Sequence, residues 1–258
     1  MTMIIIDGDS LVYKAAGAAQ HRNHETGEME YEPLSHALNN AKTLINKILD
    51  RLGSKKYKLF LTHPNDPKSF RKLLYPEYKE NRKGVSRPYY YYAVREYYER
   101  YWSAQVVHGI EADDAVAMEM YKYRFDSLDN LSSAPAILVG VDKDLDQIVG
   151  FHYNYDKDIT YFITEMEGFK NLFKQIMGGD RADNIPRIKP KWRSKKVFEE
   201  IDSSVCLDDV YESVVFECMK LDLKYDEIAW RADLLYLKRF ERDTFKLFLD
   251  RTFGEDND

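Results

Sequence analysis

The chain is poor in cysteine and has no long apolar segment. Its only two cysteines, Cys206 and Cys218, have no histidine beside them at zinc-ligand spacing, so we expect reduced thiols in a cytoplasmic protein. No run of about 18 apolar residues occurs, which argues against a membrane-spanning helix. The apolar residues 1–6 lead directly into Asp7, so a signal peptide is not expected either.

The composition is that of a soluble globular protein, with 32% charged and 44% apolar residues. The net charge of −6 argues at first against a nucleic-acid partner. Basic residues nevertheless cluster: residues 55–87 contain ten against three acidic ones, and residues 187–196 contain six and no acidic one. Such segments fit a polyanion bound beside a carboxylate site, the alternative being two solvated surfaces.

Acidic residues follow the predicted strands. Three apolar runs, at residues 3–6, 105–108 and 135–141, lead into Asp7, Glu111 and Asp142. Because the carboxyl ends of parallel strands meet at one edge of a sheet, we expect these acids to lie close together. The alternatives are local ones: an N-cap near Asp7, a role better suited to Asp9 or Ser10, and a solvated acidic first turn at residues 111–114.

Nine acidic residues are candidates for this edge: Asp7, Asp66, Glu111, Asp113, Asp114, Asp142, Asp144, Asp180 and Asp183. Without them, 35 acidic residues face 38 basic ones, so the rest of the protein is slightly positive. Hard carboxylate oxygens suit Mg²⁺ or Mn²⁺ rather than Zn²⁺, and nine exceed the needs of one octahedral ion. We predict at least two ions, roughly 4 Å apart, that hydrolyse a phosphodiester bond. Taken alone, the pair at 180 and 183 also fits ordinary Asx turns.

Residues 78–82 place an aromatic ring next to two cations. Tyr78 and Arg82 share a helical face with Lys79 beside them, which suits a terminal base and its phosphate. Pro88 then opens a tyrosine-rich segment that runs to Trp102. We expect about half of these rings to belong to the core and the others to stack on unpaired bases.

The predicted elements change along the chain. Residues 57–62 form a further strand, residues 151–155 and 159–163 a hairpin, and residues 21–31 a loop. Helical patterns cover residues 33–52, 168–177, 197–201, 207–221, 225–237 and 240–249. We predict an α/β fold with a mainly parallel central sheet flanked by helices over residues 1–164. An all-helical region follows over residues 165–258, and an acidic tail ends it at residues 254–258.

In combination, several of these motifs resemble the 5′ nuclease family. That family includes the 5′ nuclease domain of bacterial DNA polymerase I, phage 5′→3′ exonucleases and flap endonucleases. The motifs are Asp7-Gly8, Phe70-Arg71, Tyr78-Lys79 and Asn81-Arg82, followed by GIEADD (109–114), VDKDLDQIV (141–149) and GGDRADNIP (178–186). The resemblance covers residues 3–196 and, without a polymerase region, implies a stand-alone, phage-type enzyme. It implies a PIN-like nuclease core, Mg²⁺ or Mn²⁺ as cofactor, DNA with a free 5′ end, flap or nick as substrate, and a monomer.

The resemblance also implies roles for individual residues. Asp7, Asp66, Glu111, Asp113 and Asp114 would hold the first metal ion; Asp142 would bridge towards the second, with Asp144, Asp180 and Asp183. Lys79 and Arg82 match the basic pair that steers the scissile phosphate. Residues 83–104 match the helical arch through which a 5′ strand passes, and residues 178–202 a helix-hairpin-like segment. The side chains expected to contact DNA are Tyr78, Lys79, Arg82, Lys83, Arg87, Arg187, Lys189, Lys191, Arg193, Lys195 and Lys196.

One segment departs from the family pattern. After Pro186 the family has a Gly-rich hairpin that grips duplex DNA through main-chain amides, whereas residues 187–193 contain no glycine. We therefore expect side-chain cations to bind the duplex, with a strong dependence on salt.

Two alternatives remain. Asp7-Gly8-Asp9 after an apolar strand also imitates a haloacid-dehalogenase-type phosphatase, which would leave residues 111–114 and both basic segments unexplained. The other alternative is a catalytically silent DNA-binding relative, which would lack some of the acids.

Overall fold

The structure, a computed structural model, describes residues 2–125, 130–192 and 194–254. Of the tail predicted at residues 254–258, only the first residue is therefore described. No helix within the described ranges is long and apolar enough to cross a membrane.

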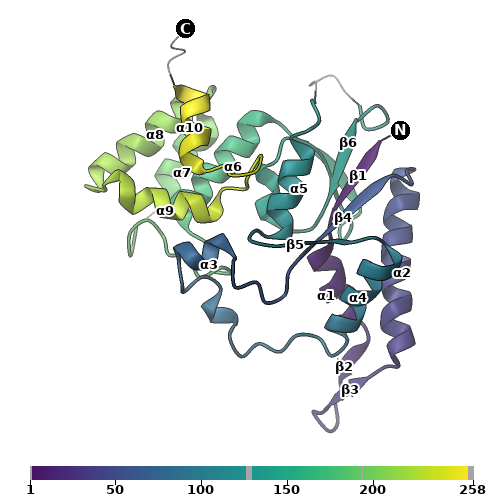
Figure 1. The fold of residues 1–258 in the computed structure, drawn as a ribbon. Coiled ribbons are helices and arrows are strands. Elements are labelled where there is room, and N and C mark those ends of the chain that lie inside the picture. Colours follow the sequence, from purple (N-terminus) through teal and green to yellow (C-terminus); the bar gives the residue numbers. More distant parts are fainter. Residues whose placement is uncertain (1, 126–129, 193, 255–258) are drawn as a thin grey trace.

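Five parallel strands and one antiparallel strand form the central sheet (Figure 1). Their order is β5 (Gln105–Val107), β4 (Tyr57–Thr62), β1 (Met3–Asp7), β6 (Ala136–Val139), β7 (Gly150–Asn154) and β8 (Ile159–Ile163). The pairs from β5 to β7 are parallel, and β8 returns antiparallel beside β7. The predicted mainly parallel sheet is confirmed, and so is the hairpin at its end.

Strand β1 is buried on both faces. Ile4 and Ile6 point into one apolar cluster and Ile5 into another, because successive side chains alternate across a strand. Helices α1 (Gly8–Gly17), α2 (Leu34–Leu52) and α4 (Tyr91–Tyr101) cover the first face, and α5 (Ala112–Met120) covers the second. Each fully buried isoleucine contributes about 1.5–3 kcal/mol, so the strand that ends at the predicted site is firmly held.

The turn from β1 into α1 requires a glycine. A Cβ atom at Gly8 would lie 2.7 Å from the carbonyl oxygen of Phe60 on β4. Because no side chain intervenes, α1 begins close against the neighbouring strand, directly after the end of β1.

The C-terminal helices form a separate apolar cluster beside the sheet (Figure 1). They are α6 (Glu165–Gly178), α7 (Lys195–Ser203), α8 (Leu207–Lys220), α9 (Tyr225–Leu235) and α10 (Phe245–Phe253). The start of α10 differs from the helix predicted at residues 240–249. Thr244 caps α10 by accepting a hydrogen bond from the Leu247 amide at 3.2 Å, and the residues before it fold around the buried Asp243.

The prediction of a loop over residues 21–31 was wrong for part of that segment. It contains an antiparallel hairpin of β2 (Gln20–Arg22) and β3 (Met29–Tyr31). Strands of three residues are too short to show an alternating pattern in the sequence.

The segment predicted as an arch, residues 83–104, has two parts. It follows α3 (Phe70–Leu74) and a short 3-10 helix, η1 (Glu80–Arg82). Residues 83–90 contain no helix and cross in an extended path to α4 (Figure 1). Helix α4 itself packs against α1 and α2 through Tyr91, Val94 and Tyr98.

Candidate functional site

Two adjacent strands deliver carboxylates to the same edge of the sheet. β1 ends at Asp7, whose Oδ1 accepts a hydrogen bond from the Asp9 amide at 3.1 Å. The neighbouring strand β6 leads to Asp142, which is the N-cap of the 3-10 helix η2 (Lys143–Gln147). Asp142 Oδ1 accepts a hydrogen bond from the Asp144 amide at 3.0 Å. The N-cap of α1 is therefore Asp7, and the expectation that Asp9 or Ser10 would cap this helix was wrong.

The charges at this edge repel one another. Burial, with the neighbouring charges of Asp9 and Asp142, raises the pKa of Asp7 to about 7. Burial and the charges of Asp142 and Asp180 likewise raise the pKa of Asp144 to about 7. A cation among these oxygens would favour their ionised forms.

The turn that follows α6 brings two more acids to the edge. Asp180 and Ile185 exchange backbone hydrogen bonds of 2.9 and 2.7 Å, and Asp180 is 4% exposed. Its Oδ1 accepts the Ala182 amide at 2.6 Å, as an Asx turn does, while its Oδ2 lies 3.3 Å from Lys143 Nζ. The turn therefore has both an Asx geometry and a place at the acidic edge.

Residues 78–82 contact two further acids, Glu111 at the start of α5 and Asp183 in the turn after α6. Lys79 Nζ is 2.6 Å from Glu111 and 3.6 Å from Asp183, and Arg82 donates to Asp183 at 2.5 Å. Burial alone would raise the pKa of Glu111, but Lys79 and Arg71 outweigh it and lower this pKa to about 2. These two carboxylates are thus neutralised by cations of the chain.

Tyr78 does not serve as a stacking surface. Its side chain is 3% exposed, and its hydroxyl lies 2.7 Å from Glu111 Oε2 and 2.6 Å from Asp183 Oδ2. A ring buried in this way cannot receive a base, so the expected aromatic platform at Tyr78 was wrong. The residue instead connects the start of α5 to the turn after α6.

Backbone and asparagine contacts join these two segments. The Lys79 amide donates to the Asp183 carbonyl at 3.0 Å, and Asn184 Nδ2 donates to the Glu77 carbonyl at 2.9 Å. Asn81 Nδ2 donates to the carbonyl of Arg181 at 2.6 Å. We call residues 77–82 and 180–184 together the loop pair. It sets the position of two cations relative to two carboxylates.

Two of the nine predicted ligands have other partners. Asp114 is 0% exposed and forms two hydrogen bonds with Arg71, while it also accepts the Glu111 and Lys238 amides. Asp66 accepts the amides of Gly109 and Lys68. The buried ion pair with Arg71 leaves Asp114 without an open oxygen, so its assignment to a metal does not fit the structure. Each oxygen of Asp66 accepts only one amide, so its role as a ligand stays a prediction. Asp113, next to Asp114, has its pKa raised by burial despite the nearby Arg71.

Asp9 belongs to the site region although it was not among the predicted ligands. It accepts the Thr62 amide at 3.2 Å and a hydrogen bond from Arg95 at 3.2 Å, and its charge acts on Asp7. Arg95 also donates to the Thr62 carbonyl at 2.6 Å. The signal in the sequence was the second aspartate of Asp7-Gly8-Asp9, which places an acid in the first turn of α1.

The donor chemistry at the edge fits a hard divalent cation, since every candidate ligand is a carboxylate. Within the described ranges, no group of three or more acidic, histidine or cysteine side chains is arranged so that it could hold a metal ion. Asp7 and Asp144 are the acids on which repulsion acts most clearly, because the charge of Asp142 raises the pKa of both, and at Asp144 the nearby Lys143 opposes that effect.

The second basic segment is exposed. Arg187, Lys189, Lys191, Lys195 and Lys196 are all solvent-exposed, whereas Arg193 lies outside the described residues. In the first segment Lys83 is exposed and Arg87 half-buried, but Arg71 is 2% exposed and is not a surface cation.

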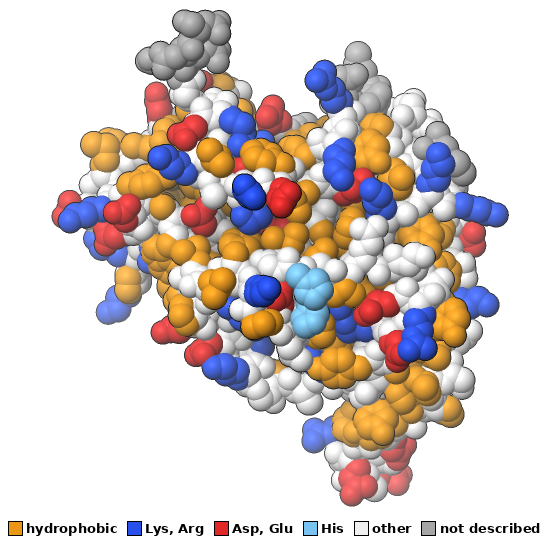
Figure 2. All heavy atoms as spheres, in the orientation of Figure 1, with side chains coloured by type: hydrophobic (Ala, Val, Ile, Leu, Met, Phe, Trp, Pro, Cys, Tyr) orange, Lys and Arg blue, Asp and Glu red, His pale blue; other side chains and the backbone are white. Residues whose placement is uncertain are grey.

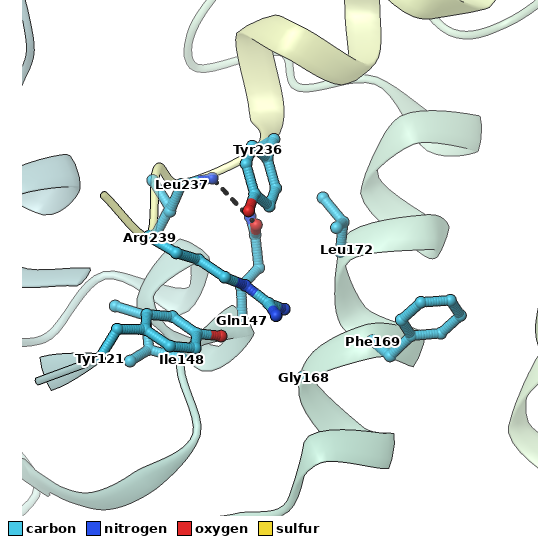
Figure 3. Close-up of a pocket in the computed structure, with 9 residues that line it drawn as sticks. All are labelled: Tyr121, Gln147, Ile148, Gly168, Phe169, Leu172, Tyr236, Leu237 and Arg239. Atoms are coloured by element: carbon cyan, nitrogen blue, oxygen red, sulfur yellow. Dashed lines mark hydrogen bonds between the residues drawn. The ribbon is translucent and has the colours of Figure 1, made fainter. Parts of the chain in front are cut away.

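The enclosed cavity lies elsewhere. Figure 3 shows it between η2, α6 and the segment after α9, with Tyr121 and Arg239 pointing into it. It contains about 10 Å³, which is room for one water molecule, and the Tyr121 hydroxyl has no hydrogen-bond partner among the described residues. None of the predicted ligands lines it, so it is not the reaction site.

A family model described as the N-terminal, resolvase-like domain of 5′-3′ exonucleases matches residues 2–174. The solved structure of T5 D15 protein co-crystallised with metal ions is similar, with a TM-score of 0.57 and 15% identity, covering 91% of this chain and 86% of that chain. A bacteriophage T5 D15 flap endonuclease in complex with DNA and metal ions has a TM-score of 0.56 and 17% identity over 91% and 86%. A T5 5′-exonuclease with bound zinc has a TM-score of 0.54 and 15% identity over 91% and 89%. No curated protein sequence matches the chain.

Proposed function

The chain belongs to the 5′-3′ exonuclease family and is a nuclease, and we propose that it hydrolyses DNA phosphodiester bonds at a free 5′ end, flap or nick, as a monomer, with Mg²⁺ or Mn²⁺. One observation carries the proposal. Carboxylates from β1, β6 and the turn after α6 meet at one sheet edge, with Lys79 and Arg82 beside them. That combination suits a phosphodiester bound next to divalent cations.

The acids divide into two groups by their partners. We propose that Asp7, Asp142, Asp144 and Asp180 hold metal ions first, after their side chains turn towards the ion. The charge of Asp142 raises the pKa of both Asp7 and Asp144, and Lys143 offsets this only in part at Asp144. Glu111, Asp113 and Asp183 complete the site on the side of Lys79. When bound, the ions would supply an activated water and a counter-charge for the leaving oxygen.

The cations of the loop pair bind and orient the phosphate. Burial would lower the pKa of Lys79, but Glu111 and Asp183 outweigh it and raise this pKa, so Lys79 remains protonated at neutral pH. Arg82 is about half exposed and offers a guanidinium fork to phosphate oxygens. Exposed cations at residues 187–196 then bind the backbone of the adjoining duplex.

The decisive variant is Asp142→Ala. We expect it to abolish cleavage of a 5′-labelled flap or nicked duplex in Mg²⁺, while the affinity for that DNA in a chelating buffer changes little. Asp50→Ala, which removes an exposed acid from α2, is the matched control and should cleave normally.

Two outcomes would contradict the proposal. Retained turnover by Asp142→Ala would remove the acidic edge from the reaction. A wild-type chain that binds DNA but leaves it intact with magnesium and manganese would be a catalytically silent relative. The size of the first labelled product separates an exonuclease from a flap endonuclease.

A further inference from the structure

A groove runs along the side of α5 that lies next to β4 and β5. Its volume is about 800 Å³, which is within the range of sites that hold a ligand. Ala115, Met118 and Glu119 of α5 line it together with Lys122, and the spacing of these four residues places them on one side of the helix and its last turn. The other lining residues belong to β4, β5, the segments beside α5 and after α9, and α10. The sheet and the C-terminal helices therefore both contribute to this groove.

Apolar side chains form much of the groove surface. They are Phe60 of β4, Val107 of β5, Ile110, Met118 and Phe240. Phe240 is 43% exposed, although its ring is large and apolar. Figure 2 shows this face of the molecule, with hydrophobic side chains across the region of α5 and basic ones on both sides of it. Contiguous apolar surface that is bordered by polar residues is typical of protein interaction sites.

Positive charge exceeds negative charge around the groove. The lining contains four cations and two acids, which are Lys58, Lys122, Arg239 and Arg251, and Glu119 and Glu241. Glu119 is 5% exposed and lies 2.7 Å from both Lys58 Nζ and Lys122 Nζ, so one carboxylate serves two cations. Arg251 is paired with the buried Asp243 at 3.0 Å. The two lysines therefore retain charge for an anionic group in the groove.

Arg239 is held in place by aromatic rings. Its guanidinium carbon is 4.6 Å from the centre of the Tyr121 ring and 4.4 Å from that of Phe248. Arg239 and Tyr121 line both the groove and the enclosed cavity, and Figure 3 shows their side chains next to each other. Within the part of the chain that the structure describes, the ion pairs at this groove involve its other three cations and none involves Arg239. A guanidinium fixed in this way suits a carboxylate, because little side-chain entropy is lost on binding.

The groove leads away from the acidic edge. α5 begins beside that edge, directly after Glu111, and Lys122 follows its last turn, about 15 Å from its start along the helix axis. Lys58 likewise lies near the start of β4, whereas the acidic edge is at the ends of the strands. DNA bound at the acidic edge therefore leaves this end of the groove free.

The chemistry of the lining favours a peptide over a nucleic acid. A sugar–phosphate backbone would pair with the cations but would leave Val107, Met118 and Phe240 exposed to water. A peptide that carries both apolar side chains and carboxylates covers these three residues and also meets the excess of positive charge.

We propose that the groove along α5 binds an acidic, amphipathic peptide segment of a partner protein. Apolar side chains of that segment pack on Val107, Met118 and Phe240, and its carboxylates pair with Lys122 and Arg239. A partner bound in this way leaves the acidic edge accessible to DNA. The proposal does not depend on the nuclease function, since binding is measured without cleavage.

Binding of a defined peptide tests the groove. The probe is a fluorescein-labelled decapeptide in which aspartate alternates with leucine and phenylalanine. Its fluorescence anisotropy is followed as the full-length chain is added in a chelating buffer, so that no metal ion bridges the two. The peptide should bind, and an analogue with asparagine in place of every aspartate should have an affinity at least about tenfold lower, because it lacks the charge pairs.

Two single variants locate the contact. Lys122→Glu reverses the charge of a side chain that is 64% exposed, and Phe240→Ala removes the apolar ring. Each should weaken binding of the aspartate peptide about fivefold or more. Lys195→Glu, an equal charge reversal on the exposed segment of residues 187–196, is the matched control and should bind the peptide like the wild type. Both groove variants should cleave a nicked duplex in Mg²⁺ at the wild-type rate.

Photo-crosslinking locates the contact without any variant. The same peptide with a benzophenone group at its centre should crosslink to the wild type at Met118 or within residues 239–241. Crosslinks only outside the lining of the groove would overturn the proposal.

Other outcomes would also overturn it. These are no binding, equal binding of the asparagine analogue, or a loss of binding in Lys195→Glu alone. Displacement of the peptide by a nicked duplex would assign the groove to nucleic acid, and a dimer in sedimentation that excludes the peptide would assign it to a second copy of the chain. Binding that becomes about tenfold tighter when the acidic residues 255–258 are removed would assign the groove to the chain's own end.

Discussion

Two residues of the loop pair adopt a backbone conformation that is unusual for them. Lys79 has φ of 58° and Asn184 has φ of 60°, in the left-handed region that most side chains avoid. Each such residue costs on the order of 1 kcal/mol, and such strain is concentrated at functional sites. The hydrogen bonds between the two loops compensate for it, and they hold the amino group of Lys79 against Glu111.

Asn81 is a positioning residue by this argument, because it contacts backbone carbonyls rather than the expected substrate. Asn81→Ala removes its hydrogen bonds to the Arg181 and Ala182 carbonyls. We expect kcat to fall about 10- to 100-fold through misplacement of Lys79 and Arg82, with a much smaller change in KM.

The free energy of unfolding should change by only about 1 kcal/mol in Asn81→Ala, because the residue is exposed. Asn39→Ala, an exposed asparagine of α2, is the control for steady-state kinetics and denaturant unfolding. A rise in KM with an unchanged kcat would show that Asn81 contributes to binding instead.

The raised pKa of Asp144 makes stability depend on pH in metal-free buffer. Its pKa is about 7 in the folded chain and 3.8 as the ordinary value, so the folded state binds more protons between those limits. The wild type should therefore lose stability as the pH rises from 4 to 7.

Asp144→Asn avoids this loss and keeps an acceptor for Gln175 Nε2. At pH 8 the variant should be about 1–3 kcal/mol more stable than the wild type, with ~4 kcal/mol as the upper bound, and below pH 4 the difference should vanish. Denaturant unfolding in a chelator measures both values. A difference that is constant with pH would refute the assigned pKa.

At the scale of elements, one buried ion pair joins the sheet region to the C-terminal helices. Arg71 of α3 donates to Asp114 of α5 and, at 2.8 Å, to the Leu234 carbonyl of α9. Asp114 in turn accepts the Lys238 amide after α9 at 3.2 Å. Both side chains are fully buried or nearly so. Helices α3, α5 and α9 are therefore joined through Arg71, although by sequence this residue belongs to the basic segment of residues 55–87.

Arg71→Met should lower the free energy of unfolding by about 3–5 kcal/mol, because it leaves Asp114 buried and unpaired. Lys72→Met changes the exposed neighbour on the same helix and should have an effect within about 0.5 kcal/mol. Guanidinium unfolding of both variants makes the comparison. Equal effects of the two substitutions would mean that the pair is not a structural connection.

At the scale of the whole molecule, the net charge of −6 conceals an uneven distribution. Several acids lie at the sheet edge or are paired with cations, whereas the cations of residues 187–196 remain exposed. Electrostatic binding to DNA depends on this local surface and on the counterions that it displaces, rather than on the total charge.

In a chelating buffer, the affinity for DNA should therefore fall as salt is added, so that log Kd rises linearly with the logarithm of the salt concentration. Replacing Arg187, Lys191 and Lys195 by alanine should reduce the slope by about 0.9 for each phosphate contact that is lost. Replacing Lys42 and Lys47, which are exposed on α2, should leave the slope unchanged. A flat wild-type affinity between low and moderate salt would exclude side-chain cations as the main contact with the duplex.

Much of the architecture could be read from local patterns. Apolar runs and helical periodicity predicted the parallel sheet and most helices, because the period of a pattern is a property of neighbouring residues. The same patterns placed Asp7 and Asp142 at strand ends. Parallel topology then brought them to one edge without any knowledge of side-chain contacts.

The partners of individual side chains were decided only by the tertiary structure. Asp114 meets Arg71 from 43 residues away, and Tyr78 meets Asp183 from 105 residues away. The sequence alone determined which residues are acidic, basic or aromatic and which elements carry them. Whether a carboxylate faces a cation, an amide or another carboxylate depends on long-range packing, since burial and distant charges set both its pKa and its free oxygens.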